Sequence, residues 1–145
     1  MSRQNLSPDI TPAGAGSISE GVIRFDRTLH GSVQEVWEAV TTTARVDADR
    51  VTYDFGAEGA ATGEVTHSDP PRALVHTWNW PGLPESYVTW KVGEGNLRLT
   101  HQGLLGEEAV DYALGWHLIL DELEGVTSDP AALRTYYSGL LPRNS

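Results

Sequence analysis

Two histidines and several tryptophans occupy positions from which they could recognise a small molecule. His76, Trp78 and Trp80 recur at every second position of one segment, and His101 lies near the end of another. Side chains two residues apart on a β-strand point to the same face. Indole and imidazole rings combine apolar surface with a few directional polar groups, as the walls of ligand pockets do. The spacing therefore predicts an aromatic wall that carries polar atoms.

We expect the remaining wall residues from the inward positions of two further strands and from one stripe of a helix. The alternative for each aromatic residue is simple packing, because large rings also dominate protein cores. A buried histidine likewise needs a polar partner, which for His76 would be a ligand or Tyr112. The predicted ligand-binding set is His76, Trp78, Trp80, Trp90, Leu99, His101, Tyr112, Trp116 and Leu120.

Other chemistries lack the residues that they require. The chain has no cysteine, and His76, His101 and His117 show none of the local spacings of a metal site. No GxSxG elbow and no phosphate-binding glycine motif occurs. Acidic residues at 107, 108 and 111 fit the positive end of a helix dipole better than paired-carboxylate catalysis. We therefore expect no metal and no cofactor, and we assign no catalytic residue.

Composition narrows the class of partner. The 145 residues include 20 acidic and 10 basic side chains, a formal charge of −10, which disfavours nucleic acid and anionic membranes as partners. The lack of cysteine, of a signal-peptide pattern and of a long apolar segment is typical of a cytoplasmic protein. We expect a monomer or a weak homodimer that binds a small apolar or aromatic molecule.

The elements that must position these residues follow from hydrophobic periodicity. Residues 1–19 carry few large apolar side chains, which predicts a disordered tail, and residues 20–145 read as one domain. Alternation over 21–30 predicts a strand, and Ser32 with Glu35 predicts a capped helix. Five short β-rich segments follow between about 50 and 103. A helical stripe then runs from about 109 to 123, before a shorter helix that ends near 140.

This order predicts an α+β fold in which a curved antiparallel sheet of about six strands wraps around a long C-terminal helix. Such a sheet leaves space against the helix, where a ligand pocket commonly forms.

Five stretches resemble a known family. They are VWEAVTT (36–42), DPPRALVHTW (69–78), SYVTWKV (86–92), LRLTHQGL (97–104) and YALGWHLILDEL (112–123). In order and spacing they resemble the START-like (SRPBCC) superfamily, and within it the bacterial homologues of the C-terminal domain of the heat-shock-protein-90 ATPase activator. The resemblance covers about residues 20–141 and implies the helix-grip fold. Members of the superfamily include small-molecule binders, lipid carriers and cyclases.

One segment departs from the family pattern. Between Thr43 and Tyr53 the family usually has a second short helix and a tryptophan-containing loop, whereas this chain has a compact segment without tryptophan. We expect the pocket entrance to be altered there.

Three functions remain open. The first is a non-enzymatic protein that holds an apolar or aromatic ligand between the sheet and the long helix. The second is an enzyme similar to the cyclases and dehydratases of the superfamily, in which His76 or His101 with Tyr112 would move a proton. The third is a co-chaperone-like module that contacts another protein through the exposed face of its sheet.

Overall fold

The computed structural model describes residues 12–55, 57, 59–104 and 108–140. Its strands match the predicted segments closely, apart from one additional strand at the start. Strands and helices follow in the order β1 (Ser17–Ser19), β2 (Val22–Thr28), α1 (Val33–Thr43), β3 (Arg50–Asp54), β4 (Ala60–Asp69), β5 (Ala73–Trp78), β6 (Ser86–Gly93), β7 (Asn96–Gln102), α2 (Glu108–Glu124) and α3 (Pro130–Ser138).

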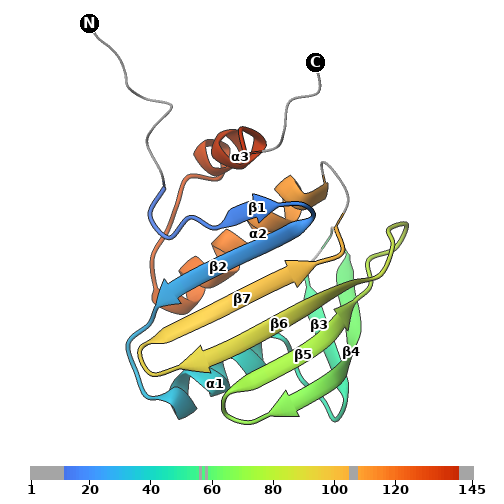
Figure 1. The fold of residues 1–145 in the computed structure, drawn as a ribbon, viewed down its shortest axis with the longest axis vertical. Helices are drawn as coiled ribbons and strands as arrows, with labels where there is room; N and C mark the ends of the chain where they lie inside the picture. Colours follow the sequence, from blue (N-terminus) through green and yellow to red (C-terminus); the bar gives the residue numbers. More distant parts are fainter. Residues whose placement is uncertain (1–11, 56, 58, 105–107, 141–145) are drawn as a thin grey trace, which may run out of the picture.

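The strands of the described residues form one antiparallel seven-stranded sheet in the order β1-β2-β7-β6-β5-β4-β3. In Figure 1, α1 and α2 both lie behind this sheet, and α3 lies beyond the β1 edge and packs on α2. The sheet curves around the helices, so its inner face and α2 enclose the core. The predicted α+β helix-grip architecture is confirmed.

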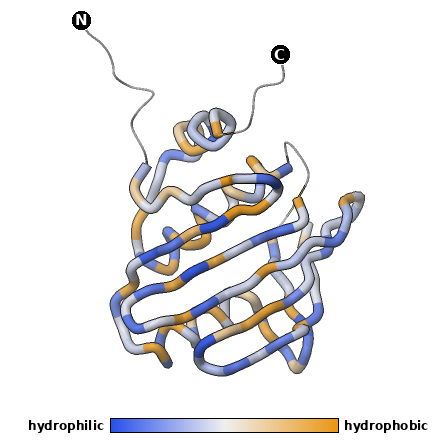
Figure 2. The backbone as a smooth tube through the Cα atoms, viewed as in Figure 1, coloured by the Kyte–Doolittle hydropathy of each residue, from blue (hydrophilic) through white to orange (hydrophobic). Residues whose placement is uncertain are grey.

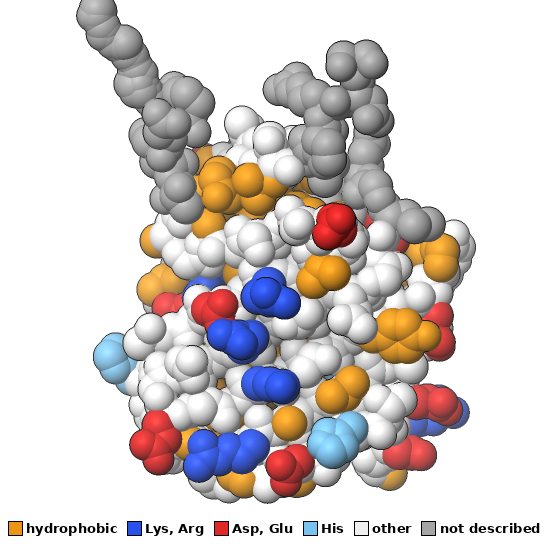
Figure 3. All heavy atoms as spheres, in the orientation of Figure 1, with side chains coloured by type: hydrophobic (Ala, Val, Ile, Leu, Met, Phe, Trp, Pro, Cys, Tyr) orange, Lys and Arg blue, Asp and Glu red, His pale blue; other side chains and the backbone are white. Residues whose placement is uncertain are grey.

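Alternation of side chains explains why one face of the sheet is buried. Hydrophobic and hydrophilic residues alternate along the strands in Figure 2. The inward positions of β5, β6 and β7 are buried as their parity predicts, among them Leu74, Val88 and Leu97. Figure 3 shows the outer face, where basic side chains gather. Lys91 and Arg98 are paired there across β6 and β7, and Arg98 contacts Asp26 at 2.7 Å.

Strand β4 bends between its two partners. Its first half pairs with β3, its second half pairs with β5, and the register shifts between Val65 and His67. A Cβ atom on Gly63 would lie 1.8 Å from the Thr77 carbonyl oxygen, so glycine alone permits this close approach to β5. The bend brings β3 around toward α2. Phe55 is the first residue after β3.

The predicted tail needs a correction. Residues 1–11 lie outside the described residues, but Ser17–Ser19 form β1 and pair with β2. Glu20 and Gly21 join the two strands with φ angles of 52° and 77°, as a two-residue hairpin turn requires. The half-buried Ile18 packs against the core. The segment has few large apolar residues to bury, but its backbone hydrogen bonds to β2 hold it in the sheet.

A buried ionic cluster holds this segment against the helices. Arg27 lies on the inward face of β2 with 4% of its surface exposed. Its guanidinium contacts Asp121 at 3.1 Å and Glu124 at 2.5 Å, and its Nε donates to the Gly14 carbonyl at 2.8 Å. The Gly16 N–H donates to the Tyr137 hydroxyl of α3. The cluster therefore joins the N-terminal segment to β2, α2 and α3.

The segment after α1 is short, as its sequence predicts. The helix ends at Thr43 with Ala44 as its C-cap, and an Asp47–Arg50 bridge leads directly into β3. No described helix lies between α1 and β3. In the described part of the chain, no helix is both long and apolar enough to cross a membrane.

Candidate functional site

His76 is part of a linear series of buried hydrogen bonds that runs from Thr77 through His76 and Tyr53 to Trp90. Its Nδ1 lies 2.8 Å from the Thr77 carbonyl oxygen, which can only accept, so Nδ1 carries the proton. The unprotonated Nε2 then accepts from the Tyr53 hydroxyl at 2.8 Å. The Tyr53 oxygen accepts in turn from the Trp90 indole N–H at 3.0 Å. Tyr53 supplies the partner that the sequence suggested would be Tyr112 or a ligand.

His101 is satisfied in the opposite tautomer. The Trp116 indole N–H donates to its Nδ1 at 2.9 Å, so the proton lies on Nε2. Nε2 donates to the Ser86 hydroxyl at 2.8 Å. Both rings are fully buried, and each of their four nitrogens has a partner within the protein.

Burial keeps both imidazoles neutral. Desolvation lowers the pKa of His76 to about 4, against the opposing hydrogen bond to the Thr77 carbonyl. Desolvation and the neighbouring His76 lower the pKa of His101 to about 3. Burial also raises the pKa of Tyr53 far above its ordinary value. These groups are a neutral polar core rather than proton-transfer residues poised near neutral pH.

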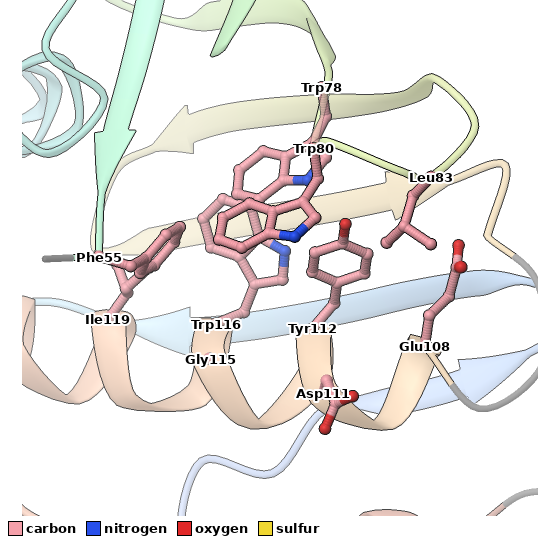
Figure 4. A pocket seen from close by; sticks show the side chains of 10 residues that line it. All are labelled: Phe55, Trp78, Trp80, Leu83, Glu108, Asp111, Tyr112, Gly115, Trp116 and Ile119. Atoms are coloured by element: carbon pink, nitrogen blue, oxygen red, sulfur yellow. The ribbon is translucent and has the colours of Figure 1, made fainter. Parts of the chain in front are cut away.

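A pocket of about 260 Å³ opens beside this core, between the ends of β3 and β5 and the Glu108–Ile119 part of α2. Its wall is mostly aromatic, as Figure 4 shows. The ring centroids of Trp78 and Trp116 lie 5.2 Å apart, those of Phe55 and Trp80 5.7 Å apart. The lining residues are Phe55, Trp78, Trp80, Leu83, Glu108, Asp111, Tyr112, Gly115, Trp116 and Ile119.

Gly115 leaves space where the helix faces the pocket. A Cβ atom built on this residue would meet no atom within 4 Å, so no neighbour requires a glycine here. Glycine inside a helix costs about 1 kcal/mol relative to alanine. The helix therefore carries an unfavourable residue whose structural effect is to widen the pocket.

Trp78 brings a buried donor to the pocket wall. The residue is 2% exposed, and among the described residues its indole N–H has only a poorly aligned contact with the Tyr112 side chain. Tyr112 lies beside it, with ring centroids 5.5 Å apart. Burial raises the pKa of Tyr112, and its hydrogen-bonding contact with the Trp78 indole opposes that rise. A buried donor without a well-aligned acceptor is unfavourable, so a better-placed acceptor from a ligand would stabilise this site.

The structure divides the nine predicted residues into two groups. Trp78, Trp80, Tyr112 and Trp116 line the pocket. The other five are buried in the packed interior behind it, with exposures of 1% or less: His76, Trp90, Leu99, His101 and Leu120. Of this second group, none lines the described pocket, and the histidines contribute by holding Tyr53 and Trp116 in place.

Several lining residues escaped the sequence analysis. Phe55 ends the predicted β-rich segment 51–55 with the same parity as the buried Val51 and Tyr53, so its signal was present. Leu83 lies in a predicted turn, where alternation gives no direction. Ile119 follows Trp116 at the i+3 spacing of the same helical face, a signal that was present. Gly115 was detectable too, as a glycine inside a strongly periodic helix without a packing reason.

Comparisons with known proteins identify the fold. No family model matches the chain, and no curated protein matches it. The crystal structure of CalU16 from Micromonospora echinospora is similar, with a TM-score of 0.68 at 20% identity over 87% of this chain and 94% of CalU16. The solution structure of the Aha1 dimer from Colwellia psychrerythraea has a TM-score of 0.55 at 15% identity, over 71% of this chain and 92% of that chain.

DynU16, a protein from the dynemicin biosynthetic locus, is also similar. Its TM-score is 0.64 at 25% identity, over 74% of this chain and 47% of DynU16, so the match spans about half of that protein. At these identities the likeness is one of fold, and it agrees with the START-like architecture that the sequence predicts.

Proposed function

We propose that this protein binds a small, flat and largely aromatic molecule in the pocket between the β3 and β5 ends and α2. The observation that carries the proposal is a pocket lined by five aromatic rings and by a helical glycine that has open space where a Cβ would stand. Aromatic walls with a few polar groups are typical of small-molecule sites. The likeness to CalU16 and DynU16 supports the proposal at the level of the fold.

The pocket does not favour the cyclase-like alternative. General acid or base catalysis needs a titrating group within reach of the substrate. Neither His76 nor His101 lines the described pocket, and every nitrogen of both rings has an internal partner. The proposal is therefore one of binding without an assigned reaction.

The kinship with the heat-shock-protein-90 activator stays a prediction, as do the co-chaperone-like role and the cytoplasmic location. Support for the kinship comes from the similar fold of the Aha1 dimer.

Isothermal titration with naphthalen-2-ylmethanol, a neutral flat probe, tests the proposal. Gly115→Leu places a side chain in the open space and should weaken binding of the probe at least about tenfold by steric exclusion. Glu122→Leu is the matched control, because it adds the same side chain at an exposed position of the same helix. It should leave binding unchanged.

Two results would overturn the proposal. One is a wild-type protein that fails to bind this probe, indole and anthracene-9-methanol alike. The other is a folded Gly115→Leu variant that binds as the wild type does, because the pocket would then not be the site.

A further inference from the structure

Besides its aromatic wall, the pocket has negatively charged side chains in its lining. Glu108 and Asp111, in the first turn of α2, are its charged lining residues, and the described lining contains no lysine or arginine. In Figure 4 the Glu108 carboxylate lies on the pocket side of the helix, beside Leu83 and Tyr112, whereas Asp111 points away. Asp111 pairs with Arg134 at 2.9 Å. By its direction in Figure 4, Glu108 is the carboxylate that faces the mouth.

The electric field of these carboxylates reaches into the pocket. Burial is the main cause of the raised pKa of Tyr112, and the charges of Glu108 and Asp111 raise it further. The positive end of the α2 dipole would by itself favour an anion, but both acidic side chains lie in that first turn. The mouth thus favours a cation.

The aromatic wall suits a cation as well. The Phe55 ring centroid lies 6.3 Å from that of Trp78 and 5.7 Å from that of Trp80, and Tyr112 stands edge-on to Trp78. The negative faces of aromatic rings attract ammonium groups, most strongly at tryptophan. Several rings beside a carboxylate form the type of cage that recognises an organic ammonium.

Trp78 supplies an independent indication of a ligand. Among the described residues its buried N–H has no well-aligned acceptor, only a poorly aligned contact with Tyr112, and it lies on the Tyr112 side of the indole in Figure 4. A carboxylate at the mouth and an incompletely satisfied donor farther in define two ends of a ligand.

We propose that the pocket takes an organic ammonium ion, with a flat aromatic body between the indoles, a protonated or quaternary nitrogen toward Glu108, and a hydrogen-bond acceptor toward Trp78. This proposal rests on the proposed function and specifies its ligand class. It distinguishes the site from a purely apolar cavity, which would prefer the neutral form of the same molecule.

Three probes that share one ring system test the charge. They are naphthalen-2-ylmethylammonium, naphthalen-2-ylmethanol and 2-naphthoate, titrated at low salt. The ammonium should bind at least about fivefold more tightly than the alcohol, through cation–π and ion-pair attraction. The carboxylate should bind most weakly. Added salt should reduce the advantage of the ammonium, because it screens the half-exposed pair.

Glu108→Gln should remove about threefold or more of the ammonium's advantage over the alcohol, measured as the ratio of the two affinities. Glu122→Gln is the matched control, because it removes one negative charge from an exposed position of the same helix. It should leave the preference intact, and this separates a local contact from the effect of net charge.

A second series tests the acceptor. The positional isomers of quinolinylmethylammonium replace one ring carbon with an acceptor nitrogen. At least one isomer should bind more tightly than the naphthalene parent and move the Trp78 indole N–H resonance downfield, with the resonance assigned by its loss in Trp78→Phe. If no isomer does so, the acceptor part of the proposal is wrong.

The outcomes separate this proposal from the function on which it rests. Equal binding of the ammonium and the alcohol, both sensitive to Gly115→Leu, would overturn the ammonium preference and retain the pocket. Tightest binding of 2-naphthoate would reverse the assignment of charge. Binding of no probe would overturn the pocket itself.

Discussion

Both ring nitrogens of His76 are hydrogen-bonded, so its replacement should affect the stability of the fold. Phenylalanine would keep a ring of similar size, but the Tyr53 hydroxyl would lose its acceptor and the Thr77 carbonyl its donor. Both groups are buried among aromatic side chains where water does not replace the lost bonds. The imidazole therefore has a structural role, although the alternation of the strand predicted that it would contact a ligand.

We predict that His76→Phe lowers the free energy of unfolding by about 2 kcal/mol at neutral pH, as expected for buried polar groups left unpaired. Urea unfolding followed by fluorescence measures this. His67→Phe, a matched change on the exposed half of β4, should alter stability by less than about 0.5 kcal/mol. An unchanged midpoint in His76→Phe would show that the hydrogen-bond chain contributes no net stability.

Alternation predicted which side chains turn inward but not which of them meet. His76, Trp78 and His101 are buried as their parity requires. Tyr53 reaches His76 although β4 lies between their strands, because the bend of β4 curls β3 around the core. Arg27 shows the same limit, since its inward position was readable but its partner Asp121 lies 94 residues later. Such contacts depend on curvature and register, which local patterns do not encode.

Among the elements, α2 shows most directly how the fold and the pocket are related. Its buried stripe, with Ala113, Trp116 and Leu120, attaches it to the sheet, and its Tyr112–Ile119 side forms one wall of the pocket. Gly115 lines the same pocket beside Ile119, on the side of this face away from the buried stripe. Stability of the helix and space for a ligand therefore make opposite demands on this residue.

We predict that Gly115→Ala raises the free energy of unfolding by about 0.5 to 1 kcal/mol, because alanine is the better helix former and its methyl group enters open space. The same methyl group should weaken binding of naphthalen-2-ylmethanol severalfold. Thermal unfolding and titration of one sample measure both effects. A destabilised variant would mean that the helix is strained at this point, and unchanged binding would place the ligand elsewhere.

The order and type of the predicted elements were readable because their periods change clearly from two to 3.6 and back. β1 was the exception among the described strands. Three residues are too few for an alternation signal, and Ser17 and Ser19 are exposed. The Glu20-Gly21 turn was the available signal, because a two-residue turn with glycine before an alternating segment favours a hairpin.

At the scale of the whole molecule, three neutral histidines share one interior. Besides His76 and His101, His117 is fully buried under α3, with its Nδ1 2.7 Å from the Tyr137 hydroxyl. Burial lowers the pKa of His117, against the opposing charge of Asp121. All three shifts have the same direction, so their effects on stability add.

The sign of the pH dependence follows from proton uptake. Unfolded histidines bind a proton below about pH 6.5, whereas folded His76 and His101 bind one only near pH 4 and pH 3. The unfolded state therefore holds more protons in this window, and acid destabilises the fold. The contribution of these histidines to stability is complete above about pH 6.5 and declines as the pH falls toward 4.

We predict a loss of about 2 kcal/mol for each of these two histidines between pH 7 and pH 4.5. Urea unfolding at half-unit steps of pH measures it. His76→Phe should start lower at pH 7 but lose less on acidification, with its slope between pH 6 and pH 4.5 reduced by about one proton. Val92→Ala, a core change without a titrating group, should shift the curve and keep the wild-type slope. A wild-type slope in His76→Phe would mean that this imidazole is protonated in the folded protein, with Tyr53 and Thr77 arranged differently around it.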